Sequence, residues 1–221
     1  MLIMKRLFRD HGLSIVMLGL FFLAFLVGQV VSGRSEYNEE RQKRAAPPVS
    51  FSGYLKSPHF LEATAENWES EFLQMGVFVL ATAFLYQKGS AESKDPRKRH
   101  EHHCTRGVTA DSPWPARKGG WVLRLYEHSL SAAFGLLFTC AFFLHANGGL
   151  ALFNEERRAE GEEAMTLIQY LKSSRFWFES FQNWQSEFLA IGCMVVLSIF
   201  LREVNSPESK QVQTPHWENE E

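Results

Sequence analysis

Two polar motifs of similar composition contain the residues whose types and spacing could do chemistry in this chain. Each motif places an asparagine, a tryptophan, a serine and a glutamate within five residues, at the start of an apolar run. A carboxylate inside a membrane is costly to bury, so two glutamates that meet between helices would suit a cation or another polar ligand. The predicted site consists of Asn67, Trp68, Ser70 and Glu71 from the first motif and Asn183, Trp184, Ser186 and Glu187 from the second.

The same residues have a second interpretation, which is the chemistry of a helix start. Thr64 and Ser180 precede the two motifs and could act as N-caps. Acidic side chains in a first helical turn are favoured by the helix dipole. Under this interpretation Glu71 and Glu187 lie in the hydrated headgroup region and bind no ligand.

Two histidines form a further candidate pair. His11 and His128 each lie at the start of an apolar run and could form a pH-sensitive pair at the inner mouth of the protein. The alternative is a solvated position for both, in which Asp10 and Glu127 beside them make ion pairs of little energetic weight.

A basic segment between the second and third apolar runs contains donors that zinc or copper prefers. These donors are His100, His102, His103 and Cys104. No complementary donor cluster is found elsewhere in the sequence, and basic residues near a membrane suit anionic lipid headgroups. We therefore predict a flexible basic linker, with neither a bound metal nor a cofactor.

Four apolar runs must position these residues. Two of them, residues 12–31 and 129–147, hold about 20 residues each, and at 1.5 Å per residue such a helix spans about 30 Å, the thickness of a bilayer core. The other two reach a similar length when they are extended back to a tryptophan suited to the interface, as residues 68–86 and 184–201. The expected fold is an all-α, integral membrane bundle of four transmembrane helices.

An internal repeat organises the four runs into two hairpins. Residues 54–94 and 170–210 are identical at 19 of 41 positions without a gap, so positions 116 residues apart correspond. Each copy contains two spans, an even number, and both copies therefore begin on the same side of the membrane. A tandem parallel repeat of this kind is related by a pseudo-two-fold axis along the membrane normal.

The repeat and the charges predict the domain organisation and the orientation. Residues 1–94 form the first hairpin, residues 95–125 a basic cytoplasmic linker, residues 126–210 the second hairpin and residues 211–221 a disordered tail. The side that holds both termini and the linker carries 14 Lys and Arg residues, against 9 in the two loops within the hairpins. Because positive charge stays inside, both termini are predicted to be cytoplasmic.

Several function classes are disfavoured by composition. A net charge of −2 gives no basic field for nucleic acid, and three cysteines give no disulfide framework. No phosphate-binding loop, nucleophile elbow or zinc-protease motif is found, so an enzyme is not expected. The predicted function is a non-enzymatic scaffold or envelope component in the lipid bilayer, with protein partners left open. The alternative is a small transporter or channel that uses Glu71 and Glu187 as a homodimer.

Long motifs throughout the chain support a resemblance to a known family. They are Tyr37-Asn38-Glu39-Glu40, Pro47-Pro48-Val49-Ser50, Tyr54-Leu55, Glu66-Asn67-Trp68-Glu69-Ser70-Glu71-Phe72-Leu73, Gln87-Lys88-Gly89-Ser90-Ala91-Glu92-Ser93-Lys94, Tyr126-Glu127-His128-Ser129-Leu130, and the run from Phe176 to Phe188. With these motifs the chain resembles the small bacterial membrane proteins of domain-of-unknown-function family 6766. The resemblance covers nearly the whole chain and implies a bacterial membrane location, which we expect to be the inner membrane. It implies no activity.

Overall fold

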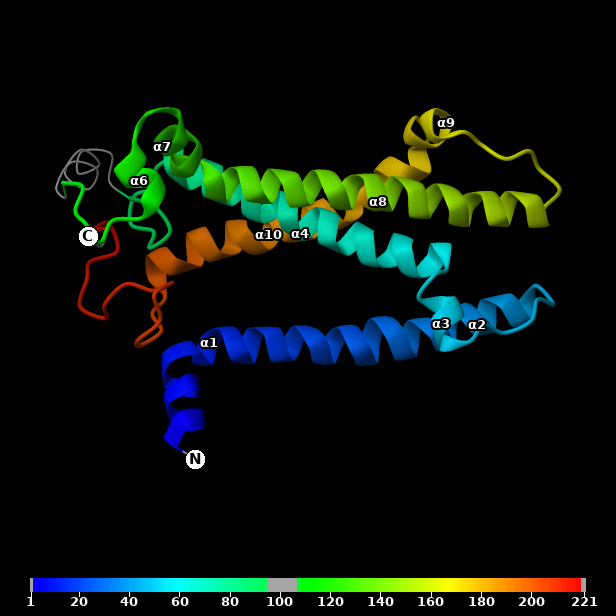
Figure 1. Cartoon of the computed structure of the whole chain (residues 1–221), viewed down its shortest axis with the longest axis horizontal. Coiled ribbons are helices and arrows are strands. Elements are labelled where there is room, and N and C mark those ends of the chain that lie inside the picture. Colours follow the sequence, from blue (N-terminus) through cyan, green and yellow to red (C-terminus); the bar gives the residue numbers. More distant parts are fainter. Residues whose placement is uncertain (1, 95–106, 220–221) are drawn as a thin grey trace. The chain divides into compact units, whose positions relative to one another are not determined.

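The computed structural model describes residues 2–94 and 107–219, and within these ranges every regular element is a helix (Figure 1). The prediction of an all-α chain is therefore confirmed for the described residues. The elements are α1 (Leu2–Ala24), the π-helix η1 (Phe25–Ser32), α2 (Gly33–Lys43), α3 (Phe51–Tyr54), α4 (Pro58–Phe84), α6 (Trp114–Lys118), α7 (Gly120–Glu127), α8 (Ser129–Ala159), α9 (Leu167–Leu171) and α10 (Ser174–Phe200).

The chain divides into two compact units, each of which contains parts of both sequence halves. Unit 1 comprises Met1–Ala65 and Phe143–Phe176, and unit 2 comprises Glu66–Phe142 and Trp177–Glu221. The divisions fall inside α4, α8 and α10, each of which is one continuous helix. Each unit is therefore built from two segments that are distant in sequence.

Three helical stretches of the described chain are long and apolar enough to cross a membrane, where the sequence analysis predicted four. They are the continuous stretch Lys5–Lys43, α8 and α10. Helix α4 has the same 27-residue length as α10, but it is less apolar. Gln74, Ala81 and Ala83 stand where α10 has Ala190, Leu197 and Ile199. By length and composition, the structure thus supports three such helices and suggests a membrane protein.

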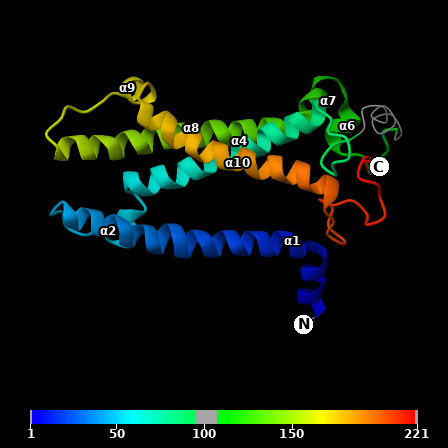
Figure 2. The same ribbon diagram turned by 180° about the vertical axis from the view of Figure 1, so that it is seen from behind.

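Both predicted inner-mouth histidines lie at a break before a long apolar helix. His11 has φ −136° and ψ 19°, outside the helical region, and Figure 1 and Figure 2 show the first turns of α1 bent away from the rest of the helix. His128 has φ −111° and ψ 11° and separates α7 from α8. Both side chains are exposed. Each histidine therefore marks the start of a long apolar helix.

The long helices α4 and α10 begin earlier than the sequence analysis placed them. The Ser57 hydroxyl accepts a hydrogen bond from Phe60 N at 3.2 Å, and the Ser173 hydroxyl accepts one from Phe176 N at 3.4 Å. These serines are therefore the residues that cap the helix starts. The prediction of N-caps at Thr64 and Ser180 is wrong, because both residues lie inside a continuous helix.

The loop after α2 and the loop after α8 are held by the same asparagine hydrogen bonds. The Asn38 side chain accepts from Val49 N at 2.7 Å and donates to Val49 O at 3.3 Å. The Asn154 side chain accepts from Met165 N at 2.7 Å and donates to Met165 O at 2.9 Å. At the same 116-residue spacing, Arg41 Nε donates to Pro47 O at 2.8 Å and Arg157 Nε donates to Glu163 O at 2.7 Å.

A buried tyrosine packs against a helical glycine beside each loop. Tyr54 and Tyr170 are fully enclosed, and a Cβ added to Gly33 or to Gly149 would collide with the respective hydroxyl. Burial, with Glu36 and Tyr37 nearby, raises the pKa of Tyr54 to about 12. Its hydroxyl therefore stays protonated and donates to Gln29 O at 3.2 Å.

The helix ends that precede the two loops also contact each other within unit 1, and Figure 2 shows both loops at the same end. Tyr37 donates to the Glu155 carboxylate at 3.4 Å. Arg44 and Arg175 both pair with Glu156, at 3.5 and 2.7 Å. In unit 1 the end of α2 is therefore joined to α8 through side chains from both sequence halves.

The described part of the C-terminal tail is bound to the turn that follows α4, within unit 2. The predicted disorder covers residues 211–221, and residues 211–219 of this segment form turns. The Asn219 side chain donates to the carbonyls of Gln87, Ser90 and Ser93 and accepts from Gly89 N and the Tyr86 hydroxyl. Of the predicted linker, residues 95–106 lie outside the described residues, and α6 and α7 occupy much of the rest.

Candidate functional site

All eight residues of the predicted polar site belong to unit 2, four on α4 and four on α10. Glu71 is exposed and Glu187 is half-buried, and the two lie close enough for the charge of Glu71 to act on the Glu187 carboxyl. The structure therefore brings the two predicted carboxylates into one neighbourhood.

The predicted serines satisfy their own helices. The Ser70 and Ser186 hydroxyls donate to the backbone carbonyls of Asn67 and Asn183, each at 2.8 Å. Hydroxyls bonded to the preceding turn in this way are ordinary for a helix interior. Trp68 completes the first motif and is exposed.

The other side chains of the second motif bind carboxylates that the sequence analysis did not single out. Asn183 Nδ2 donates to Glu66 Oε1, and Trp184 Nε1 donates to Glu69 Oε1 at 3.1 Å. Glu69 is completely buried. The two carboxylates from α4 therefore receive hydrogen bonds from two consecutive residues of α10.

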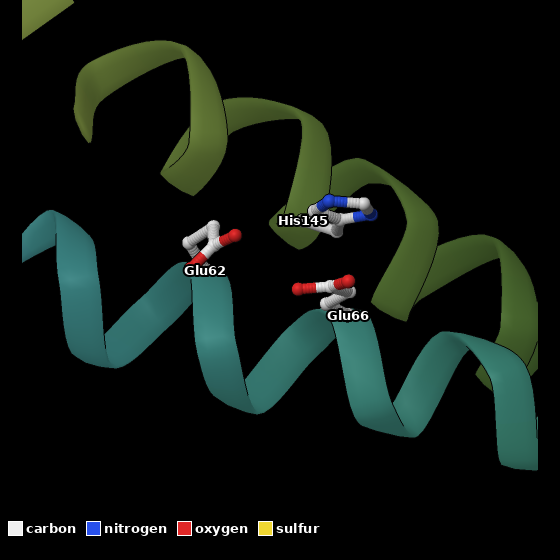
Figure 3. A group of neighbouring side chains, drawn as sticks. All are labelled: Glu62, Glu66 and His145. Atoms are coloured by element: carbon white, nitrogen blue, oxygen red, sulfur yellow. The ribbon is translucent and has the colours of Figure 1, made fainter. Parts of the chain in front are cut away.

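Three potential metal ligands on α4 and α8 form a separate cluster (Figure 3). Glu62 and Glu66 are half-buried, and His145 on α8 is completely buried. The ligand atoms of the three side chains all lie within 4.8 Å of one another. Glu66 follows Glu62 by one turn of α4, so the helix itself sets the spacing of the two carboxylates.

The close approach of α8 to α4 in unit 1 positions His145 against Glu62. Gly148, which follows His145 by about one turn, has no side chain to hold the helices apart. A Cβ at Gly148 would lie 2.7 Å from Glu62 N and 3.0 Å from its Cα. The His145 ring also stacks on Phe176, with centroids 5.0 Å apart and 30° between the planes. Glycine at such a contact is how helices pack closely in membranes.

This cluster was missed because its members are distant in sequence. The spacing of Glu62 and Glu66 predicts a shared helix face, and His145 stands out as a histidine near the end of an apolar run. Neither signal indicates that the two helices meet. The predicted donors His100, His102, His103 and Cys104 lie outside the described residues.

A second acidic pair lies at the end of unit 2 that contains the turns after α4 and α10. Glu92 is hydrogen-bonded to Glu208, which follows it by 116 residues, and it lines a cavity of about 400 Å³ with Phe78, Thr82 and Tyr86. Burial is the main cause that raises the pKa of Glu92 to about 7, and the bond to Glu208 and its charge add to this. The Glu92 carboxyl therefore holds its proton up to near neutral pH.

Comparison with known proteins identifies a family and no function. The family profile described as "Domain of unknown function (DUF6766)" matches residues 4–221. No curated protein and no solved structure matches the chain.

Proposed function

Because the chain belongs to the DUF6766 family, whose function is unknown, we propose its function from its own residues. The chain is a non-enzymatic scaffold of the bacterial inner membrane that crosses the bilayer four times, with both termini in the cytoplasm. The observation that carries this proposal is the set of three helical stretches long and apolar enough to span a bilayer. Lys5–Lys43, α8 and α10 are the first, third and fourth crossings.

Helix α4 is the second crossing, and its polar groups are compatible with a position inside the membrane. Glu69 and Gln74 are buried and bond to α10, through Trp184 Nε1 and Glu187 O. Polar groups in a bilayer must be satisfied within the protein, and these bonds meet that condition. The correspondence of α4 with α10 at the 116-residue spacing also supports a crossing of equal length.

The two loops supply the scaffold surface. Each loop is fixed by an asparagine and an arginine that bond to its backbone, so little conformational entropy is lost when a partner binds. Functional contacts concentrate on loops that a rigid framework positions. We therefore assign partner binding to residues 44–50 and 160–166.

The three native cysteines provide a test of the crossings. Cys104 lies in the linker, whereas Cys140 and Cys193 lie within α8 and α10. A membrane-impermeant maleimide should label Cys104 in inverted vesicles and not in intact spheroplasts. A Glu163→Cys variant, with its added thiol in a loop, should be labelled at this thiol in intact spheroplasts and not in inverted vesicles.

A three-crossing protein would give a different labelling pattern. If α4 does not cross, the linker lies outside and Cys104 is labelled in intact spheroplasts. That result would overturn the four-span proposal. The C-terminus would then also lie outside, which a reporter fused there would detect independently.

A second candidate function is a small homo-oligomeric transporter or channel. The specific observation in its favour is that Glu71 and Glu187 lie near enough in unit 2 for the charge of Glu71 to act on Glu187. In proteoliposomes, Glu71→Gln and Glu187→Gln should then reduce ion or solute flux. Unchanged flux would remove the support for transport and leave the scaffold function.

A further inference from the structure

We propose that Glu62, Glu66 and His145 form a binding site for one divalent transition-metal ion of the zinc class. This inference goes beyond the scaffold function and does not depend on it. None of the three residues belongs to the predicted polar site, and none belongs to the donor set of the linker.

The donor set suits such an ion. One imidazole nitrogen and two carboxylates are ligands that Zn²⁺ accepts in proteins, and a zinc site with three protein ligands leaves one position for water. The donor atoms of the three side chains lie within 4.8 Å of one another, so small rotamer changes bring them to ligating distance of a single ion. The side chains converge on a common point in Figure 3.

The surroundings orient the ligands before any ion binds. The Phe176 ring stacks on His145 and limits rotation of the imidazole. The Asn183 amide donates to one oxygen of Glu66, which directs the carboxylate. Hydrogen bonds to ligands from a surrounding shell are a regular feature of metal sites. The contact of Gly148 with the Glu62 backbone fixes the distance between the helices that carry His145 and Glu62.

The charge balance also favours a divalent cation. Two half-buried carboxylates beside a completely buried imidazole carry a charge of −2 when the imidazole is neutral. A dication brings the sum to zero. The competing explanation is a protonated His145 that forms ion pairs with the two carboxylates, and the experiment must distinguish these two states.

The three donor residues have no equivalent donors at the positions that lie 116 residues away from them. At the 116-residue spacing, Glu62, Glu66 and His145 correspond to Phe178, Gln182 and Gln29. Gln29 Nε2 donates to Thr64 Oγ1 at 3.2 Å in unit 1, so the glutamine makes a helix contact of its own. A glutamine at the position that corresponds to His145 can therefore take part in a helix contact.

The test measures zinc bound by the full-length protein in detergent. The linker donors are first removed by His100→Ser, His102→Ser, His103→Ser and Cys104→Ser, and this variant is the background for all others. After treatment with a chelator, it is dialysed against Zn²⁺ alone, and the bound metal is measured by elemental analysis. We expect one zinc per chain.

Ligand substitutions should then weaken binding. His145→Gln introduces glutamine, the residue found at the corresponding position 29. We expect this substitution to reduce zinc affinity at least tenfold. We expect the same of Glu62→Gln. The matched controls are His128→Gln and Glu71→Gln, which change the same residue types outside the cluster. They should retain one zinc with unchanged affinity.

Two results would overturn the proposal. One is a background protein that binds no zinc, which would leave only a histidine–carboxylate ion pair. The other is zinc binding that His145→Gln does not change. Should His145→Gln fail to fold, Glu62→Asp keeps the charge and shortens the side chain by one methylene. Zinc should raise the melting temperature of the background protein, and equal stabilisation of the Glu62→Asp protein would contradict the site.

Discussion

One asparagine side chain holds each of the two loops, because it hydrogen-bonds to both the backbone N–H and the C=O of one loop residue. A neighbouring strand in a β-sheet makes the same pair of bonds. In Asn154→Ala, Met165 N and O lose both of these partners. A buried backbone group left without a partner costs about 1–3 kcal/mol, so we expect the free energy of unfolding to fall by about that amount. Denaturant unfolding in detergent, followed by tryptophan fluorescence, measures the change.

Asn147→Ala is the control for this loss on the same helix. The Asn147 side chain is exposed and donates to Phe143 O at 2.6 Å, one turn back in α8, where the carbonyl also belongs to the helix ladder. Its removal should change stability by no more than about 0.5 kcal/mol. Equal losses from the two alanine variants would contradict the role assigned to the loop hydrogen bonds.

Because of the acidic pair of Glu92 and Glu208, we expect the stability of the folded chain to fall as the pH rises. In the folded chain the pKa of Glu92 is about 7, against 4.5 as its ordinary value. Between these values the folded state keeps a proton that the unfolded state has released, so stability falls as the pH rises through this window. We expect a lower melting temperature at pH 8 than at pH 5, and a smaller difference in Glu92→Gln.

Glu203→Gln is the matched control for this pH effect. Glu203 is exposed and lies in the turn that precedes Glu208. Its substitution should leave the difference between pH 5 and pH 8 as large as in the unaltered protein. A pH dependence that survives in Glu92→Gln would show that other groups cause it.

At the scale of helices, the sequence predicted the apolar stretches well and the helix ends poorly. Length and hydropathy are local properties, so the runs within Lys5–Lys43, α8 and α10 could be read directly. The starts of α4 and α10 were placed about ten residues too late, because the polar first turns resemble a loop until Ser57 and Ser173 are seen as caps.

Other features of the elements depend on contacts that one sequence does not display. The π-helical register of η1 requires a shift in backbone hydrogen bonds, which side-chain periodicity does not report. The cluster of Glu62, Glu66 and His145 depends on which faces of α4 and α8 meet. The predicted neighbourhood of Glu71 and Glu187 could be inferred because the repeat places both at corresponding positions.

Two glycines of α8 allow the effect of helix packing on stability to be measured apart from the effect of helix propensity. A Cβ at Gly148 would meet the Glu62 backbone at 2.7 Å, whereas a Cβ at Gly135 would meet nothing within 4 Å. Alanine is favoured over glycine inside a helix by about 1 kcal/mol, but overpacking costs about 1–3 kcal/mol. We therefore expect Gly135→Ala to be neutral or stabilising by up to about 1 kcal/mol.

Gly148→Ala, by contrast, should destabilise the protein by about 1–2 kcal/mol, because the backbone of α4 cannot yield as a flexible side chain would. Melting temperatures of the two variants, measured in the same detergent, give the comparison. If Gly148→Ala were as stable as Gly135→Ala, then α8 would not approach α4 as closely as described.

At the scale of the whole molecule, neither sequence half forms a compact unit by itself. Unit 1 and unit 2 are each built from two segments of the chain, and each unit contains residues of both halves. Within unit 2, Trp184 bonds to Glu69 at 3.1 Å, and the buried serines Ser90 and Ser198 bond to each other at 3.0 Å. The two halves of the chain therefore depend on each other, although residues 54–94 and 170–210 correspond in sequence at a fixed spacing.

This dependence predicts the behaviour of a chain cut within the linker. If the cut lies between His100 and Glu101, residues 1–100 and 101–221 retain every bond described between the halves. When the fragments are co-expressed, an affinity tag on the first should recover the second at a ratio of about one to one. Each fragment expressed alone should be recovered several-fold less, because its buried polar groups, Glu69 among them, lose the partners that satisfy them. Recovery of the tagged fragment 1–100 alone, at the same yield and as a single species in size-exclusion chromatography, would instead mean that the first half folds independently.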